Sequence, residues 1–501
     1  MSALKRNLVA NVVGRVWAGL VGLAFIPLYI RYLGIEAYGL IGFFMVMQAW
    51  FVLLDMGMTP TLTREMARFT SGAHTPQSIR ALLRSLECIV ITLGVVTGFA
   101  VWAASGWLAS DWLRAERLPV GTVAQAIALM GGVAVLRLIE GIYRGALLGL
   151  QKQVFFNVAY ALMETVRAAG AVAVLAWLSP SVEAYFAWQG LVSLAAVGVF
   201  AAATYGHLPG ADLPDGFLRQ ALGSIRQFLT GMMAYMFLAV LQTQIDKILL
   251  SRLLSLEEFG YYSLAAALAA ALIVLINPVT QAFFPRLSEL VARGEQRQLV
   301  RSYHVAAQLV SVFAAPAALT LVFFGRDLLF LWSGDRTLAE EVAPVLALLA
   351  AGTLLNCLMH VPFITQFAYG RIDITVKTNL AAVAVLLPAV YLASLHYGAV
   401  GAACAWVAIN AGYVLVGMPY MYRRLLAGER RAWYRDDVML PLSAASLAGG
   451  LLWYTLPPSL GAAGKLAWLL GAGLIMLGAS IAAAPAIRAR LFRTAVADGK
   501  R

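Results

Sequence analysis

YLGIEAYGL at residues 32–40 lies between two long apolar runs, and LLSLEEFGYY at residues 253–262 repeats its pattern between two more. The shared pattern is Leu-x-(Ile/Leu)-Glu-x-(Tyr/Phe)-Gly, and the aligned acids, Glu36 and Glu257, are 221 residues apart. An acid favours the first turn of a helix, an aromatic residue suits a membrane interface, and glycine permits close packing or a tight turn. The motif therefore predicts the same connection between two helices at two places in the chain.

The composition predicts that these helices lie in a membrane. The chain has 501 residues, of which 61% are hydrophobic and 12% charged. Soluble domains carry about 45–50% apolar and about 25% charged residues. A bilayer is crossed by about 20 consecutive apolar residues, and we predict an all-α polytopic membrane protein with fourteen spans at 9–30, 38–56, 86–108, 120–140, 155–178, 183–205, 226–250, 258–280, 304–324, 342–366, 378–395, 399–420, 437–456 and 463–484.

The repeat extends beyond the quoted motif. The same offset aligns Thr59 with Thr280 and Arg80 with Arg301, and each copy continues into a long basic loop, at 62–84 and 283–304. Six predicted spans separate the copies, so both face the same side of the membrane, as in a parallel repeat. We predict two pseudo-symmetric six-helix lobes with a cavity between them. Their predicted boundaries are 1–204 for the N-terminal lobe, 205–222 for a cytoplasmic linker, 223–425 for the C-terminal lobe, and 426–501 for two further spans and a tail.

The positions of Lys and Arg predict the orientation. With the N-terminus inside, most of the 37 basic residues fall in the predicted inner segments, and short cytoplasmic loops hold such an excess. Both termini are therefore expected in the cytoplasm. The net charge of +12 then reflects topology and attraction to the inner leaflet; nucleic-acid binding is not expected, because no soluble basic face exists.

Polar residues form stripes on the first-lobe helices, where ionisable groups usually face a cavity or each other. In the first span, Asn11 and Arg15 are four residues apart, and no acid of that helix reaches Arg15, so we expect a cation that lines a cavity. The fourth and fifth spans add candidate substrate-binding residues at three- and four-residue spacing. These residues are Arg137, Glu140, Tyr160, Glu164 and Arg167. The charges of Arg137 and Glu140, and those of Glu164 and Arg167, could instead neutralise each other within their own helices.

The second lobe offers fewer charges. Gln242 and Asp246 share one face of the seventh span, and Gln242 is a candidate substrate contact. Asp246 is either a carboxylate that couples ion movement to transport or the partner of Arg252 or a loop residue. His360 either titrates near neutral pH as a second coupling group or is a hydrogen-bonded packing residue.

The chain shows no enzyme signature. It has no phosphate loop, no nucleophile elbow and no His/Cys/Asp spacing typical of a metal site. Its three cysteines have no paired spacing and lie in apolar stretches, which predicts neither disulfides nor metal. No cofactor is expected other than a coupling ion, H⁺ or Na⁺.

Several stretches resemble bacterial polysaccharide and O-antigen flippases, the Wzx-like transporters of the superfamily that also holds the MATE multidrug exporters. The resemblance covers nearly the whole chain, and its motifs are RYLGIEAYGLIGFF (31–44), LLDMGMTPTLTREMA (53–67), GLQKQVFFNV (149–158), QIDKILLSRLLSLEEFGYYSLA (244–265), FFPRLSEL (283–290) and GAVGAACAWV (398–407).

This resemblance implies alternating access in a bacterial inner membrane. It implies transport of an undecaprenyl-diphosphate-linked oligosaccharide to the periplasmic leaflet, in a pathway with glycosyltransferases and a polymerase and among membrane lipids. Arginine suits a diphosphate because its planar fork binds phosphate oxygens in pairs. The chain departs from the family's picture in one respect, since its second lobe offers few arginines.

Three other functions agree less well with the sequence. A cation-coupled drug exporter of the same superfamily is expected to hold acids deep in the cavity, where the first span here carries Arg15 and no acid. A membrane polymerase or ligase would need a periplasmic domain, for which no stretch between spans is long enough. A structural scaffold would have little reason to keep ionisable residues inside its spans.

Overall fold

The computed structural model describes residues 17–210, 243–457 and 460–490, together with residues 14, 237, 240 and 241. The named elements within these residues are all helices, and one isolated β-bridge joins Arg114 to Ser255. The chain divides into two compact units, Met1–Gly260 and Tyr261–Arg501. This confirms the all-α architecture, and each unit has its own central helix.

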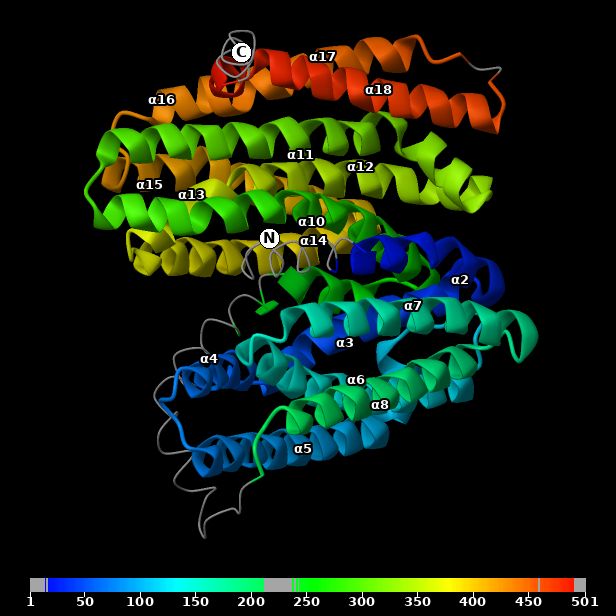
Figure 1. Ribbon diagram of the computed structural model, residues 1–501. Helices are drawn as coiled ribbons and strands as arrows, with labels where there is room; N and C mark the ends of the chain where they lie inside the picture. Colours follow the sequence, from blue (N-terminus) through cyan, green and yellow to red (C-terminus); the bar gives the residue numbers. More distant parts are fainter. Residues whose placement is uncertain are drawn as a thin grey trace. The chain divides into compact units, whose positions relative to one another are not determined.

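In the first unit, α6 is the central helix. It contacts α3, α4, α5 and α8 (Figure 1). Small and branched residues of α6 are buried, such as Ala126, Ile127 and Ala134. The helices of this unit are α2 (Ile26–Leu33), α3 (Ile35–Leu54), α4 (Met58–Thr70), α5 (Pro76–Trp107) with the π-helical turn η1 (Leu108–Trp112), α6 (Val120–Gly149), α7 (Gln153–Trp177), α8 (Val182–Gly206) and the first turn of α10 (Leu256–Ala292).

In the second unit, α11 is the central helix, and it packs against α12, α17 and α18. Its buried face is rich in alanine, including Ala306, Ala314 and Ala318, which lets the neighbouring helices approach closely. Beyond the rest of α10, the unit consists of α11 (Gln296–Ser333), α12 (Arg336–Leu358), α13 (His360–Ala368), α14 (Ile372–Gly412), η2 (Tyr413–Gly417), α15 (Met418–Arg424), α16 (Arg430–Ala432), η3 (Trp433–Met439), α17 (Leu440–Tyr454) and α18 (Ala462–Ala483).

Ten helices of the described chain are long and apolar enough to cross a membrane. The protein is therefore a multi-pass membrane protein, as the composition predicts. The expected number of fourteen spans stays a prediction, because the first and seventh spans, 9–30 and 226–250, lie partly outside the described residues. The lobe limits that depend on the 205–222 linker also stay predictions, since residues 211–222 lie outside the described residues too.

One predicted connection coincides with a break inside a long helix. α14 is interrupted at Gly398, whose φ of 54° and ψ of −135° are not helical. Next to it, a Cβ on Gly401 would lie 2.1 Å from the carbonyl oxygen of Ala393. The two sides of the break therefore pack closely, as expected of separate spans at 378–395 and 399–420.

The basic segments after each repeat are helical, where the sequence predicts long loops. In the first copy, residues 62–84 belong to α4 and to the first turns of α5, with only residues 71–75 between them. Apolar residues at helical spacing are buried on these turns, among them Leu62, Met66, Ile79 and Leu83. The prediction was wrong because the many charged residues hide this amphipathic pattern.

The repeated motifs mark the start of corresponding helices and contact each other. α3 begins at Ile35 and α10 at Leu256, which are also 221 residues apart. A Cβ on Gly39 would lie 2.3 Å from the carbonyl oxygen of Leu256, and a Cβ on Gly260 would lie 2.4 Å from that of Ile35. Each glycine thus admits the backbone of the other copy, which explains why both copies carry glycine at this position.

Candidate functional site

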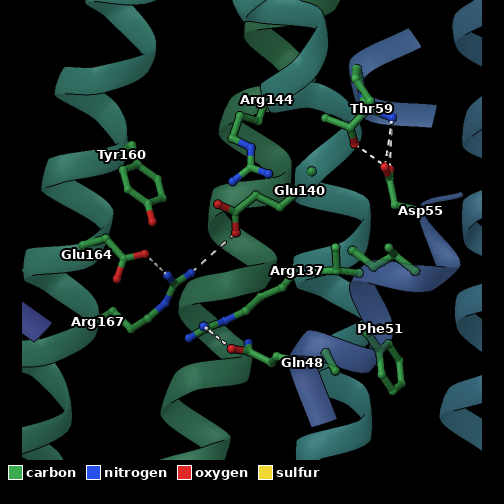
Figure 2. Close-up of a pocket in the computed structure, with 15 residues that line it drawn as sticks. Gln48, Phe51, Asp55, Thr59, Arg137, Glu140, Arg144, Tyr160, Glu164 and Arg167 are labelled. Carbon is green, nitrogen blue, oxygen red and sulfur yellow. Dashed lines mark hydrogen bonds and ion pairs between the residues drawn. The ribbon is translucent and has the colours of Figure 1, made fainter. Parts of the chain in front are cut away.

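A polar pocket of about 350 Å³ lies within the first unit, between α3, α4, α6 and α7 (Figure 2). Arginines and acids of α6 and α7, and Asp55 between α3 and α4, face it. Such a combination is expensive in a membrane unless it serves function or holds helices together. Its lining consists of Gln48, Phe51, Val52, Asp55, Thr59, Pro60, Ala134, Arg137, Leu138, Glu140, Gly141, Arg144, Tyr160, Glu164 and Arg167.

Arg167 lies between two acids. Its guanidinium forms an ion pair with Glu164 on the same helix and a longer one, at 3.5 Å, with Glu140 on α6. Ser193 of α8 accepts a further, 3.4 Å hydrogen bond. Arg167 is only 5% exposed. The intrahelical pair that the spacing of residues 164 and 167 predicts is present, and it is extended across to a second helix.

Arg137 is held by amides. Its Nη1 donates to Gln48 of α3 and its Nη2 to Gln189 of α8, each at 3.1 Å. The guanidinium also lies 5.3 Å from the centre of the Phe44 ring. No ion pair joins Arg137 to Glu140 in the described chain, so the second predicted intrahelical pair does not form. The positive charge of Arg137 therefore has no carboxylate in direct contact.

Three buried donors of this pocket have no acceptor among the described residues. They are Nε of Arg137, Nε of Arg167 and Nε2 of Gln48. A buried donor without a partner costs about 1–3 kcal/mol. A ligand rich in oxygen acceptors would satisfy these donors if it came within hydrogen-bond distance of them.

Arg144 and Tyr160 complete the polar wall. Arg144 is exposed and has no ion pair within 4.0 Å in the part of the chain that the structure describes. Tyr160 is half-buried, and its ring stacks on Phe156 with 5.5 Å between centres. Three arginines and three acids line the pocket, so its formal charges cancel while one arginine stays open to a new partner.

Sequence reasoning missed Gln48, Gln189 and Asp55. Asp55 accepts hydrogen bonds from the backbone N and the hydroxyl of Thr59, at 3.0 Å and 2.6 Å, and so caps the start of α4. The two glutamines are isolated polar residues in apolar helices, and that rarity is the signal that could have found them. Their bonds to Arg137 join residues far apart in sequence, which spacing within one helix cannot reveal.

Three predicted site residues, Asn11, Arg15 and Gln242, lie outside the described residues. Their roles remain predictions. Two residues after Arg15 in the sequence, Trp17 donates a 2.9 Å hydrogen bond to Thr165 of α7.

The predicted coupling residues do not line this pocket. Asp246 lies 3.4 Å from Lys247. Arg252, its proposed partner, lies over the ring of Trp112 at 5.1 Å. His360 begins α13, and its ring forms no hydrogen bond or ion pair with another described residue.

A second cluster of buried charges lies in the other unit, where the sequence predicted none. His304 of α11 has Nδ1 2.5 Å from Asp437 and Nε2 3.0 Å from Glu429. Gln308, one turn along α11, donates to Asp437 at 2.9 Å. The cluster ties α11 to the segment around η3.

Glu36 and Glu257, the repeated acids, bind one connecting segment. Glu36 is buried and accepts hydrogen bonds from the backbone N of Glu116 and Arg117, at 2.6 Å and 3.1 Å. Glu257 forms a 2.9 Å ion pair with the side chain of Arg117. The backbone N of Leu256 also donates to the backbone carbonyl oxygen of Arg114 at 2.8 Å. Both copies of the motif are thus fastened to residues 114–117.

Comparison with known proteins identifies the family. The family model described as "Polysaccharide biosynthesis protein" matches residues 4–291, more than half of the chain. The chain belongs to this family. A putative O-antigen transporter of Shigella flexneri is 20% identical over 406 residues, covering 81% of this chain and 94% of that protein. The lipopolysaccharide biosynthesis protein WzxC of Escherichia coli (strain K12) is 23% identical over 218 residues, 42% of this chain and 44% of that protein.

Solved structures show the same fold at low identity. The inward closed conformation of the lipid II flippase MurJ has a TM-score of 0.69 at 11% identity and covers 94% of this chain and 97% of that one. An inward-facing multidrug resistance MATE family transporter of the MOP superfamily has a TM-score of 0.64 at 14% identity, covering 83% of this chain and 98% of that one. This member of the polysaccharide biosynthesis protein family therefore has the fold of these flippase and transporter structures, as the sequence resemblance predicts.

Proposed function

We propose that this transporter moves an undecaprenyl-diphosphate-linked oligosaccharide across a bacterial inner membrane, and that the pocket of Figure 2 binds its diphosphate. The observation that carries the proposal is the set of spare donors on Arg137, Arg167 and Gln48. A diphosphate supplies several acceptor oxygens and negative charge in one compact group. Bonds to ionised groups are about twice as strong as neutral ones, so such a ligand would satisfy these donors better than water or a neutral sugar.

The pocket also suits the first sugars next to the diphosphate. The phenol of Tyr160 and the amide of Gln48 donate and accept hydrogen bonds, and Phe51 offers an apolar wall. Arg144 is exposed and forms no ion pair within the described chain, whereas Arg137 is held by two glutamines and Arg167 by two acids. We assign Arg144 to the first contact with the diphosphate.

The distribution of charge supports a direction and a coupling for this transport. The basic residues predict that both termini and the basic helix ends face the cytoplasm, where lipid-linked oligosaccharides are assembled. We therefore propose export toward the periplasmic leaflet by alternating access. Since the pocket's charges cancel, a diphosphate would leave it negative unless cations enter. Uptake of H⁺ or Na⁺ provides that charge; Asp246 and His360 remain the predicted coupling residues. Glycosyltransferases and a polymerase would act before and after this step.

Drug export by a MATE-like mechanism fits the pocket less well. A cationic drug needs an acid that is free to pair with it. Glu140 and Glu164 both already contact Arg167, and Asp55 caps α4. The spare groups of the pocket are donors, and donors favour an anionic cargo.

The test is translocation by an Arg144→Gln variant. In proteoliposomes that contain a fluorescent undecaprenyl-diphosphate oligosaccharide, we expect a rate that is lower by about tenfold or more, because one charge-assisted contact is worth about 1.5–3 kcal/mol. Lys152→Gln is the matched control, since Lys152 is another exposed cation at the same end of α6 and does not line the pocket. Wild-type translocation by the Arg144 variant, at equal insertion, would remove the pocket from the proposed function.

A further inference from the structure

The second unit holds a basic recess at the ends of α10 and α11. Its volume is about 670 Å³. Three arginines line it and, among its described lining residues, no acid does; these residues are Ala282, Phe283, Arg286, Gln298, Arg301, Ser302 and Arg490. A concentration of like charge this close to a membrane surface requires an anionic partner or a solvated face.

The chain after α18 is anchored to α11, and this anchor brings the third arginine to the recess. α18 ends at Ala483, and the next residue, Ala484, has an extended conformation, with φ −89° and ψ 102°. The next helical turn begins with its backbone N atoms directed at Gln308, whose Oε1 accepts from Ala486 at 2.8 Å and Ile487 at 3.4 Å. The same Gln308 donates to Asp437. Arg490, one turn further, therefore lies at the recess because of a specific contact.

The other two arginines are held differently. Arg286 bonds to Glu289 at 2.9 Å and to Gln298 at 3.2 Å, which fixes its guanidinium across the recess. Arg301 is exposed and has no ion pair within 4.0 Å among residues 243–457 and 460–490. The recess therefore offers one positioned arginine and one whose charge is uncompensated, beside the hydroxyl of Ser302.

An apolar wall indicates what kind of anion fits. Ala282 and Phe283 line the same recess, and the neighbouring Phe284 is 40% exposed. The positive-inside pattern predicts that these ends of α10 and α11 lie at the cytoplasmic surface. A free phosphate gains nothing from aromatic and aliphatic neighbours, whereas a phospholipid brings both a phosphate and acyl chains to this depth.

We propose that the recess formed by Arg286, Arg301 and Arg490 binds the phosphate headgroup of an anionic phospholipid of the inner leaflet. The acyl chains lie against Phe283 and Phe284, and the phosphate oxygens accept from the arginines and Ser302. The recess shares no residue with the pocket of Figure 2. The proposal is therefore independent of the identity of the cargo.

The experiment measures lipid retention by the purified full chain. Native mass spectrometry in the presence of phosphatidylglycerol or phosphatidylcholine compares the wild type with the double variant Arg286→Gln/Arg301→Gln. We expect the wild type to retain phosphatidylglycerol preferentially and the double variant to bind it about tenfold more weakly, since each basic residue near the surface contributes to attraction of anionic lipid. Arg293→Gln is the matched control, because Arg293 is exposed, pairs with Glu289 and lies outside the recess.

Two results would overturn the proposal. One is an unchanged preference for phosphatidylglycerol in a double variant that melts at the wild-type temperature. The other is a recess occupied by inorganic phosphate, seen as equal protection of Arg301 from chemical modification by phosphate alone and by phosphatidylglycerol. If the double variant fails to fold, the single Arg301→Gln variant, whose side chain supports no ion pair, gives the same comparison.

Discussion

The two clusters of buried charge both combine basic residues, acids and glutamine, but the donors are satisfied to different extents. In the first unit, Arg137 and Arg167 face a pocket and retain donors without acceptors. In the second unit, the ring nitrogens of His304 both bind carboxylates, and Asp437 is completely buried with Gln308 on its other oxygen. A buried charge in a membrane helix therefore does not by itself indicate a transport site. Our proposed function rests instead on the donors without acceptors beside a cavity.

The largest effect is expected at the second cluster. Asp437→Ala removes the buried carboxylate to which His304 and Gln308 are bonded. Removal of one partner of a buried ion pair lowers the free energy of unfolding by about 3–5 kcal/mol. We expect a clear drop in the apparent melting temperature in detergent, with transport per folded molecule unchanged. Asp436→Ala is the control, since Asp436 forms an ion pair with Arg435 whose side chain is 70% exposed. A transport defect without loss of stability would make this cluster a second functional site.

The next effect is expected at Arg137. Arg137→Gln removes a cation that no carboxylate compensates, and its partners Gln48 and Gln189 retain amides that can bond to each other. Transport should fall at least tenfold, which corresponds to about 1.4 kcal/mol, while the melting temperature falls less than in Asp437→Ala. Translocation of lipid-linked oligosaccharide in proteoliposomes measures this. Arg326→Gln, at an exposed ion pair with Glu340, should leave both quantities unchanged.

The sequence predicted local features of both fold and site. Apolar runs predicted the helices, and the spacing of Glu164 and Arg167 predicted their ion pair. The gap between the predicted spans 378–395 and 399–420 coincides with the break in α14 at Gly398. It did not predict that Glu140 pairs with Arg167 or that glutamines of α3 and α8 hold Arg137. Those contacts depend on how helices pack, and one helix's periodicity carries no information about its neighbours.

The repeated acids give a third, smaller test of structural charge. Glu36→Ala leaves the backbone N atoms of Glu116 and Arg117 without their acceptor, at a cost of about 1–3 kcal/mol. Glu257→Ala removes a pair with the exposed side chain of Arg117, and such pairs contribute about 0–1 kcal/mol. Thermal unfolding of both variants should show the larger shift for Glu36. Equal shifts would mean that the two copies of the motif are energetically equivalent despite their different partners.

The smallest effect is expected at Glu65, outside the membrane spans. Although burial opposes ionisation, hydrogen bonds from His74 and Arg64 and the charge of Arg68 lower the pKa of Glu65 from its ordinary value of 4.5. A carboxyl group with a lowered pKa stabilises the folded state above its unfolded-state pKa, and this contribution is lost as the pH falls through the folded-state pKa.

Glu65→Gln should therefore lower stability at pH 7 by about 1 kcal/mol, and the difference from the wild type should shrink as the pH falls below about 4.5. Melting curves of both proteins between pH 7 and pH 3.5 measure this difference. Glu340→Gln, at an ion pair with both side chains exposed, is the control and should show little change at any pH. A difference for Glu65→Gln that stays constant across this range would show that its hydrogen-bond geometry, rather than its charge, holds α4 in place.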